Sequence, residues 1–246
     1  MGGSTTVTAF DRCADSYVAG RPGYPDPTLE FIRSTVDRAA QPTVLDLGAG
    51  TGILTRQLVA AGLRVVAVDR SAAMLAQADR SLPRAVADAT ALPIRSGSCG
   101  ACVAATAFHW FATPAAVAEI RRVLDPRHGR LVLVWNVPDE RDPLVRQHRA
   151  LTRPFSGGIP RFESLEWKRV LEAGAQFEPL AEHTADNPVS MDAERLVART
   201  LSTSFVAALP PSTRTELAAK VRELVSGVDG PFAYPYVTRS FVYGVR

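Results

Sequence analysis

Short apolar runs alternate with helical patterns through the first half of this chain, and this alternation constrains the fold more than any other feature. Five runs of β-branched and other apolar residues predict strands, at residues 43–47, 64–69, 84–88, 101–106 and 130–135. These runs are nearly continuous rather than alternately polar and apolar, which is typical of strands covered on both faces. Strands that alternate with helices form right-handed βαβ units, so the sequence predicts a parallel sheet between two helical layers.

The helical segments between these strands carry start and stop signals. Thr113 precedes Pro114, a pairing typical of a capped helix N-terminus, and Gly62 is placed as a helix C-terminal glycine. Ser71 is expected to cap a helix that continues to Arg80. These signals indicate helix boundaries independently of the hydrophobic pattern.

After residue 135 the pattern changes to a helical excess. A sixth strand is expected over residues 177–183, and the tail over 232–245 is β-like and aromatic. Between them lies a mostly helical stretch at 190–226, which is interrupted by two consecutive prolines.

The domain organisation follows from these lengths. The sheet needs only about two thirds of the chain at ordinary element lengths. We therefore expect a single domain over residues 1–246, with its core at about 26–185 and 232–245. The helical surplus at 186–230 is expected either to cap the ligand edge of the sheet or to extend the core.

The composition argues against several classes of protein. With 46% hydrophobic and 22% charged residues among 246, the chain has the material for a globular core. No window approaches about 18 uninterrupted apolar residues, so no membrane span is expected. Residues 1–10 carry neither a basic run nor an apolar core, which argues against a secretory signal and favours a cytoplasmic location.

The charged and metal-ligating residues indicate neither a nucleic-acid nor a metal partner. Only two of the 28 Lys and Arg residues are lysines, and the arginines are scattered rather than gathered into a stripe. Cys99 and Cys102 form a lone CxxC pair without nearby histidines, so we interpret them as buried thiols and expect no metal. The oligomeric state stays open between a monomer and a homodimer.

The strongest local signal is the run VLDLGAGTG at residues 44–52, which joins the first strand to a helix. Glycines at this position let the backbone turn tightly and approach a ligand without a Cβ in the way. Ligands of open α/β sheets lie beyond the carboxyl ends of the strands. The third glycine is Gly52 and position 53 is isoleucine, so the pattern is not the GxGxxG of dinucleotide sites.

Three aspartates stand at the ends of the first three strands. Asp46 suits a cationic ligand better than a pyrophosphate, which its charge would repel. Asp69 ends the second strand, where an acid accepts hydrogen bonds from a ribose diol. Asp88 follows the third strand and offers an acceptor for an adenine amino group. The three acids predict a ligand with a cationic part, a ribose and an adenine.

These motifs resemble those of class I S-adenosylmethionine-dependent methyltransferases. The run at residues 44–52 is similar to their first motif, Asp69 within VVAVDRSAAML to their second, and Asp88 within ADATALP to their third. The resemblance covers roughly residues 10–136. It implies an α/β, Rossmann-like, seven-stranded methyltransferase sheet with helices on both faces and a helical cap. It also implies S-adenosyl-L-methionine as the cofactor, which carries an ammonium, a sulfonium, a ribose diol and an adenine, but no phosphate.

The resemblance further assigns roles around the glycine turn. It implies that Asp46 holds the ammonium of the cofactor directly or through water, that Asp69 binds the ribose and that Asp88 binds the adenine. The cofactor-binding residues implied in this region are Asp46, Gly48, Ala49, Gly50, Asp69, Arg70, Met74, Asp88, Ala89 and Thr106.

An upstream segment resembles, more narrowly, small-molecule methyltransferases of the trans-aconitate methyltransferase-like type, which belong to methyltransferase type 11. The similar stretches are FDRCADSY at residues 10–17 and RPGYP at residues 21–25. In that family a tyrosine and an arginine close over the methionine part of the cofactor, which implies Tyr17 and Arg21. An arginine suits the carboxylate there because its fork can bind both oxygens. The alternative is that Tyr17 belongs to the core and Arg21 to the surface.

The stretch TAFHWF at residues 106–111 follows the fourth strand and resembles an aromatic-His-Trp stretch of the same narrower family. This end of the strand is expected to face the transferred methyl group. His109 is therefore a candidate general base, and Phe108 and Trp110 are candidate walls of the substrate pocket. The alternative is that the histidine is a structural residue.

The sequence thus predicts an enzyme that transfers a methyl group from S-adenosylmethionine to a small-molecule acceptor. An oxygen acceptor, hydroxyl or carboxylate, is preferred by family analogy alone. Two alternatives remain: a non-catalytic relative that only binds the cofactor, and a methyltransferase that acts on protein or nucleic acid.

Overall fold

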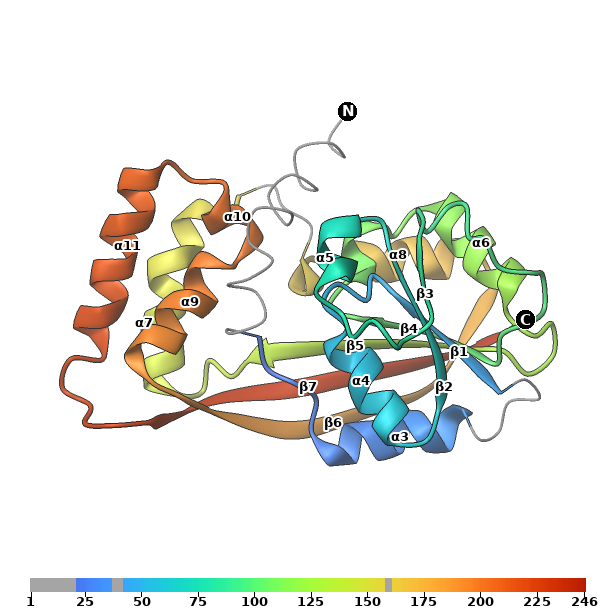
Figure 1. Ribbon diagram of the computed structural model, residues 1–246, viewed down its shortest axis with the longest axis horizontal. Helices are drawn as coiled ribbons and strands as arrows, with labels where there is room; N and C mark the ends of the chain where they lie inside the picture. Colours follow the sequence, from blue (N-terminus) through green and yellow to red (C-terminus); the bar gives the residue numbers. More distant parts are fainter. Residues whose placement is uncertain (1–20, 37–41, 158–160) are drawn as a thin grey trace. The chain divides into compact units, whose positions relative to one another are not determined.

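The structure, a computed structural model, describes residues 21–36, 42–157 and 161–246. Its seven strands form one sheet with the order β3-β2-β1-β4-β5-β7-β6 (Figure 1). The strands are β1 (Thr43–Leu47), β2 (Arg64–Asp69), β3 (Arg84–Val86), β4 (Ala101–Ala105), β5 (Arg130–Pro138), β6 (Phe177–Met191) and β7 (Phe232–Val245). This is the seven-stranded, Rossmann-like arrangement that the sequence motifs imply.

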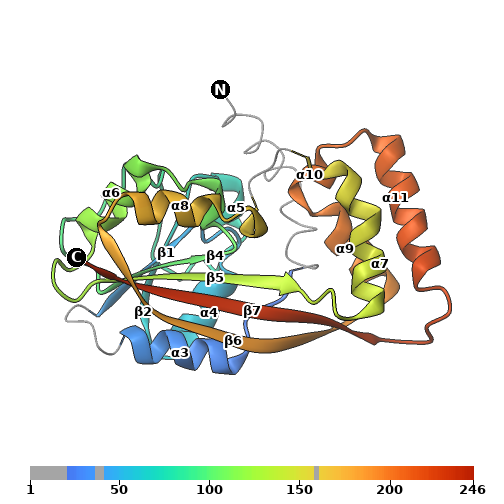
Figure 2. The same cartoon turned by 180° about the vertical axis from the view of Figure 1, so that it is seen from behind.

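The first five strands are parallel, as the alternation of strands and helices predicts. β1 pairs with both β2 and β4, and β3 and β5 extend the ladder on either side. Figure 2 shows β7 running opposite to β5, so the complete sheet is mixed. The chain order reverses between β1 and β4, and ligands of open α/β sheets bind at such a switch point, beyond the carboxyl ends of the strands.

The helices alternate with the parallel strands and then dominate the second half of the chain. They are α3 (Asp26–Val36), α4 (Ile53–Ala60), α5 (Ala72–Ala76), α6 (Pro114–Val123), α7 (Pro143–Thr152), α8 (Glu166–Ala173), α9 (Ala193–Leu201), α10 (Ser204–Ala207) and α11 (Pro211–Leu224). Short 3-10 turns cover η1 (Phe108–Trp110), η2 (Arg153–Phe155) and η3 (Phe162–Ser164). No helix in these described ranges is both long and apolar enough to cross a membrane.

The expected helix signals act as caps. The side chain of Ser71 accepts a hydrogen bond from the backbone N–H of Met74 at 3.1 Å, and that of Thr113 accepts one from Ala116 at 3.2 Å. Gly62 adopts a φ of 87°, in the left-handed region that favours glycine at a helix C-terminus. The expectation that the helix at Ser71 continues to Arg80 is wrong, because α5 ends at residue 76.

The described chain divides into two compact units. We call residues 23–36, 42–136, 161–185 and 238–246 the sheet unit, and residues 21–22, 137–157 and 186–237 the helical unit. The helical surplus expected at residues 186–230 belongs to the helical unit, which also takes in α7.

Within the sheet unit, helices cover both faces of the sheet. α3 and α4 lie on one face, and α6 and α8 lie on the other (Figures 1 and 2). Ile32 of α3 and Leu58 of α4 are fully buried against Val44 of β1 and Val132 of β5. Burial of such side chains stabilises the fold by about 1.5–3 kcal/mol each.

A polar network lies inside the core of the helical unit. His148 of α7 is buried, with its Nδ1 at 2.7 Å from the Tyr234 hydroxyl and its Nε2 at 2.8 Å from Thr200 Oγ1. Thr200 donates its own proton to the Leu196 carbonyl at 2.7 Å, so it accepts from His148 Nε2–H. Tyr234 must then donate to Nδ1. Every proton in this network therefore has a defined partner.

Candidate functional site

A glycine turn connects β1 to α4 at the switch point of the sheet. Gly48, Gly50 and Gly52 have φ angles of 69°, 56° and 74°, in the left-handed region that side chains other than glycine rarely adopt. The backbone N–H groups of Gly48 and Ala49 donate to the Val68 carbonyl of β2 at 2.8 and 3.1 Å. The turn is therefore fixed to the neighbouring strand.

Two glycines of the turn have different surroundings. A Cβ added to Gly48 would lie 2.6 Å from the Cβ of Ala107, so the loop after β4 packs directly on the turn. A Cβ added to Gly50 would meet only the terminal methyl of Met74, at 3.3 Å, among atoms within 4 Å in the described ranges. Above Gly50 the protein therefore approaches only through the flexible end of Met74, whereas the space above Gly48 is filled by Ala107.

Asp46 is buried at the end of β1, directly before the turn. It is 1% exposed, and its Oδ2 accepts a hydrogen bond from Thr55 Oγ1 of α4 at 2.6 Å. Its Oδ1 has no hydrogen-bond partner among the residues that the structure describes. Burial raises the pKa of Asp46 to about 6, and the negative charge of Asp69 adds to the increase. A nearby cation would relieve both effects.

Asp69 joins the glycine turn to the loop after β2. Its Oδ2 accepts from the backbone N–H of Gly50 at 2.8 Å, and its Oδ1 accepts from that of Ser71 at 2.8 Å. Burial raises the pKa of this carboxyl despite these hydrogen bonds. Each carboxylate oxygen can accept more than one hydrogen bond, so Asp69 keeps acceptor capacity for further donors.

Asp88 lies at the same edge of the sheet, after β3, and is exposed. Its Oδ1 accepts from both the backbone N–H and the hydroxyl of Thr90, at 2.9 and 2.7 Å, and these bonds lower its pKa. Arg70 is exposed and Ala89 is half-buried. The structure thus brings the three aspartates to the carboxyl ends of neighbouring strands, as expected.

The loop after β4 completes this edge. Thr106 has a φ of 52° and donates its backbone N–H to the Val134 carbonyl at 2.7 Å, and its hydroxyl lies 3.3 Å from that of Tyr24. Phe108 is fully buried and packs edge-to-face on Trp167, with ring centroids 6.4 Å apart. The expectation that Phe108 walls a pocket is therefore corrected, because its ring belongs to the core.

His109 and Trp110 are half-buried on the same loop. The Nε1–H of Trp135 in β5 donates to Nδ1 of His109 at 3.1 Å. The rings of His109 and Trp110 lie 5.0 Å apart between centroids. Since Ala107 packs on Gly48, this histidine is held near the glycine turn by its own loop and by the neighbouring strand.

Two side-chain amides hold the backbone of Gly23 and Tyr24, a feature that the sequence analysis missed. Gln57 of α4 accepts from Tyr24 N–H at 2.9 Å and donates to the Tyr24 carbonyl at 2.8 Å. Asn136 of β5 donates to the Gly23 carbonyl at 3.0 Å. These hydrogen bonds fix the backbone at the first residues of the sheet unit. Arg21 is assigned to the helical unit, and Tyr17 lies outside the described residues.

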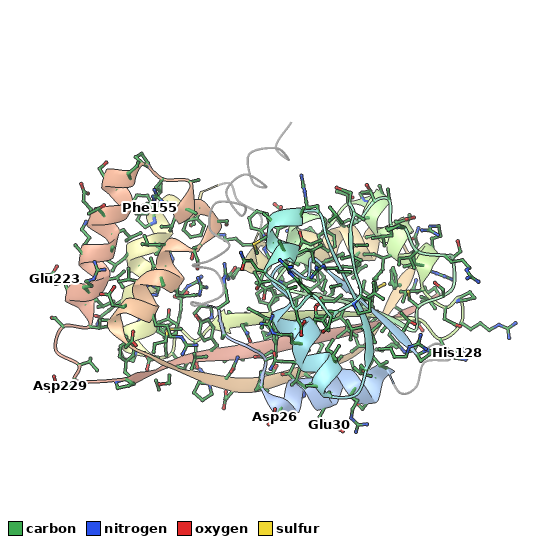
Figure 3. All side chains as sticks on the ribbon, viewed as in Figure 1. Asp26, Glu30, His128, Phe155, Glu223 and Asp229 are labelled. Carbon is green, nitrogen blue, oxygen red and sulfur yellow. The ribbon has the colours of Figure 1, made fainter. Side chains whose placement is uncertain are left out.

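One further histidine and two cysteines lie away from this edge. His128 is on the loop before β5 (Figure 3), hence at the amino ends of the parallel strands, and its side chain is 54% exposed. Cys99 and Cys102 are buried as expected, and burial raises the pKa of both thiols.

Comparisons with known proteins agree with this geometry. A family model described as "Methyltransferase domain" matches residues 45–133. The chain is 34% identical to "Uncharacterized methyltransferase Rv3342" of Mycobacterium tuberculosis, over 94% of this chain and 93% of that protein. It is 38% identical to the tRNA (carboxymethyluridine(34)-5-O)-methyltransferase ALKBH8 of Macaca fascicularis, over 46% of this chain and 17% of that protein.

A solved structure supports the fold. A protein of Anaeromyxobacter dehalogenans described as a type II methyltransferase superposes with a TM-score of 0.67, covering 92% of this chain and 97% of that chain at 24% identity. The full-length similarity to a methyltransferase and the matching fold agree with the motifs of the glycine turn. The chain therefore belongs to the class I S-adenosylmethionine-dependent methyltransferases, enzymes whose methyl donor is S-adenosylmethionine.

Proposed function

We propose that this enzyme methylates an oxygen atom of a small-molecule acceptor. The methyl donor is assigned to the glycine turn, and the observation that carries this part of the proposal is the buried Oδ1 of Asp46, which has no partner among the described residues and lies beside the turn. A buried acceptor of this kind is costly unless a ligand supplies the donor. The ammonium of S-adenosylmethionine is such a donor, and its positive charge favours the ionised carboxylate.

The remaining cofactor contacts follow from position along the same edge. Asp69 accepts from the ribose hydroxyls, and Asp88 together with Ala89 faces the adenine. Gly48 and Gly50 are assigned to the methionine part, and the assignment is supported at Gly50, where only the flexible end of Met74 lies within 4 Å of an added Cβ among the described residues. Flanking contacts come from Ala49, Arg70, Met74 and Thr106, and the upstream segment adds Tyr17 and Arg21, the latter toward the cofactor carboxylate.

When bound, S-adenosylmethionine supplies a methyl group already activated by the sulfonium. The protein therefore has to position the acceptor and exclude water rather than activate the donor. His109 and Trp110 are assigned to the acceptor side, because their loop packs on the glycine turn. Residues 186–230 are assigned to a cap that selects the acceptor.

The choice of acceptor rests on two supports. One is the name of the ALKBH8 relative, which records methylation at an oxygen of a carboxymethyl-bearing uridine. The other is the scattered distribution of arginines, which lacks the concentrated stripe expected for a nucleic-acid substrate. The name of the relative supports an oxygen acceptor but places it in a tRNA, so the preference for a small acceptor rests on the scattered arginines alone.

Calorimetric titration with S-adenosylmethionine tests the cofactor site. Gly50→Val should abolish binding because the side chain would fill the space of the ligand. Gly62→Val is the matched control, since Gly62 has a similarly positive φ of 87° and nothing within 4 Å of an added Cβ. Equal affinity of folded Gly50→Val and wild type would contradict the proposal. A screen of small acceptors that measures S-adenosylhomocysteine release then tests the activity itself.

A further inference from the structure

The hydroxyl of Thr55 is bonded to a neighbouring strand rather than to its own helix. Thr55 lies in the first turn of α4, and its Oγ1 donates to Asp46 Oδ2 of β1 at 2.6 Å. Other threonines on described helices donate to the carbonyl four residues before them, at 2.8, 2.7 and 3.0 Å for Thr35, Thr200 and Thr215. That bond within the helix is common for threonine, so the contact with Asp46 is a specific feature of Thr55.

Burial holds this contact in place. Thr55 is fully buried and Asp46 is 1% exposed, so water does not compete for the hydrogen bond, and neither side chain can turn without disturbing the packed core. With Oδ2 bonded to Thr55, Oδ1 is the oxygen of Asp46 that has no partner among the described residues. Thr55 therefore determines which of the two carboxylate oxygens remains for a donor from a ligand.

The same hydroxyl opposes the effects that favour a neutral carboxyl. Burial and the negative charge of Asp69 raise the pKa of Asp46 to about 6, and the hydrogen bond from the Thr55 side chain is the strongest effect that lowers it. The backbone N–H of Thr55 acts in the same sense. Among the described residues, the charge that acts on Asp46 is thus that of Asp69, and it is unfavourable for ionisation.

The titratable groups on the neighbouring elements do not replace Thr55. On β4 the titratable group is Cys102, a buried thiol whose pKa is raised by burial and which is therefore neutral. On α4 the charged group is Arg56, whose Nη1 donates to a backbone carbonyl of the glycine turn at 2.8 Å. On β2, Arg64 is exposed at the amino end of the strand. In the described part of the chain, the side chain that donates to Asp46 is that of Thr55.

We propose that Thr55 is a positioning residue for S-adenosylmethionine, because its hydroxyl holds Asp46 ionised and leaves Oδ1 for the ammonium of the cofactor. The proposal rests on the proposed function, which assigns that ammonium to Asp46. No contact with the cofactor is assigned to Thr55 itself. Its effect should therefore appear through the ionisation of Asp46 and change with pH.

Carboxyl carbon chemical shifts of labelled aspartate, followed with pH in the full chain without cofactor, test the ionisation. The Asp46 signal is assigned by its loss in Asp46→Asn and should titrate near pH 6 in the wild type. Thr55→Val keeps the size and the backbone N–H of the residue but removes the hydroxyl, so Asp46 should titrate at a higher pH. Thr55→Ser keeps the hydroxyl and should restore the wild-type midpoint. Thr55→Ala removes the same hydroxyl with a smaller side chain and should also raise the midpoint.

Thr28 of α3 provides the matched control. It is also fully buried, but its Oγ1 has no hydrogen-bond partner among the described residues. Thr28→Val therefore makes the same change of hydroxyl to methyl in the sheet unit without removing a hydrogen bond, and it should leave the titration of Asp46 unchanged. An equal shift in Thr28→Val and Thr55→Val would attribute the effect to packing and overturn the proposal.

Calorimetric titration with S-adenosylmethionine at pH 7 and pH 9 tests the consequence for binding. Thr55→Val should bind about 2–10-fold more weakly than wild type at pH 7, because the loss of one hydrogen bond to a charged group leaves more of Asp46 protonated. At pH 9 the carboxyl is ionised in both proteins, so the difference should fall below about twofold. A loss that is equal at pH 7 and pH 9 would indicate a purely structural effect and overturn the proposal.

Asp46→Asn separates this inference from the proposed function. An unchanged Asp46 midpoint in Thr55→Val, together with a loss of cofactor affinity in Asp46→Asn, would overturn the role of Thr55 and leave the proposed function intact. Wild-type affinity in Asp46→Asn would contradict the cofactor site of the proposed function itself.

Discussion

Asp46 in the sheet unit and His148 in the helical unit are both buried polar groups, yet their partners differ. Both ring nitrogens of His148 are hydrogen-bonded, and burial lowers its pKa to about 3, so the ring is neutral. Asp46 has a partner for Oδ2 only, and burial raises its pKa to about 6. A fully satisfied network stabilises one conformation, whereas a half-satisfied carboxyl is costly until a ligand completes it.

Whether a buried polar group has all its hydrogen-bond partners distinguishes a structural role from a binding role better than the residue type does. A buried histidine is often considered as a catalytic residue. Both ring nitrogens of His148 are already hydrogen-bonded, so neither is available to exchange a proton with a substrate. A buried aspartate is usually paired with a cation or a hydrogen-bond donor of the protein. No described residue donates to Asp46 Oδ1. The satisfied hydrogen bonds of His148 indicate a role in stability, and the unpaired Oδ1 of Asp46 supports our proposal that this carboxyl binds the cofactor.

The largest expected effect on stability is that of His148→Phe. It leaves the buried Tyr234 hydroxyl without an acceptor and removes two hydrogen bonds, so urea unfolding should show a loss of about 3 kcal/mol. Cofactor affinity should stay within about twofold. His128→Phe is the control, since that exposed histidine should change stability by no more than about 0.5 kcal/mol.

A double variant sharpens this result. Tyr234→Phe combined with His148→Phe removes both the donor and the acceptor, so its loss should be smaller than the sum of the single losses. Additive losses would show that the network contributes no coupling, and the comparison with Asp46 would then fail.

Asp46→Asn should increase the stability of the protein, whereas His148→Phe decreases it. A carboxyl whose pKa rises from 3.8 to about 6 on folding destabilises the protein once it ionises, by about 3 kcal/mol at pH 7. The amide removes this charge and keeps an acceptor for Thr55, so stability at pH 7 should increase by about 1–2 kcal/mol. Affinity for S-adenosylmethionine should fall about 10–100-fold, because a charge-assisted hydrogen bond is lost. Reduced stability together with unchanged affinity for S-adenosylmethionine would indicate that Asp46 is a structural residue and would contradict its proposed role in cofactor binding.

A smaller effect distinguishes backbone strain from ligand contact. Gly50→Ala and Gly62→Ala both place a Cβ at positive φ, and each should destabilise the protein by about 1–2 kcal/mol. Only Gly50→Ala should also weaken cofactor binding, measured by calorimetry, because only Gly50 belongs to the glycine turn. Equal losses of affinity in both variants would attribute the effect to general destabilisation.

The parallel core could be predicted from the sequence because its strands are buried on both faces. β1 and β2 begin and end where their apolar runs do. β6 was expected to end at residue 183, but it continues to Met191 through polar residues and Pro188. It is an edge strand of the sheet, where polar side chains and proline are tolerated, so its sequence resembles a loop.

At the candidate site, some residues could be predicted from the sequence and others could not, for a different physical reason. Asp46, Asp69 and Asp88 could be placed together from the sequence because each lies at or just beyond the carboxyl end of a strand, and these ends meet at one edge of the sheet. Gln57 and Trp135 could not, since their partners lie 33 and 26 residues away and no local pattern records such a pair. The helix after Ser71 is shorter than its cap suggested because Asp79 turns the chain, accepting from the Ser81 N–H at 2.9 Å.

Proton release on cofactor binding tests the central claim most directly. At pH 6 about half of the Asp46 carboxyls are protonated, and an ammonium beside Asp46 would ionise them all. Titration calorimetry in buffers of different ionisation enthalpy should therefore show release of about 0.5 proton per S-adenosylmethionine at pH 6. Affinity should be about tenfold weaker at pH 5 than at pH 7, and both effects should disappear in Asp46→Asn. Binding with no proton release and no pH dependence, or a release that persists unchanged in Asp46→Asn, would contradict the account.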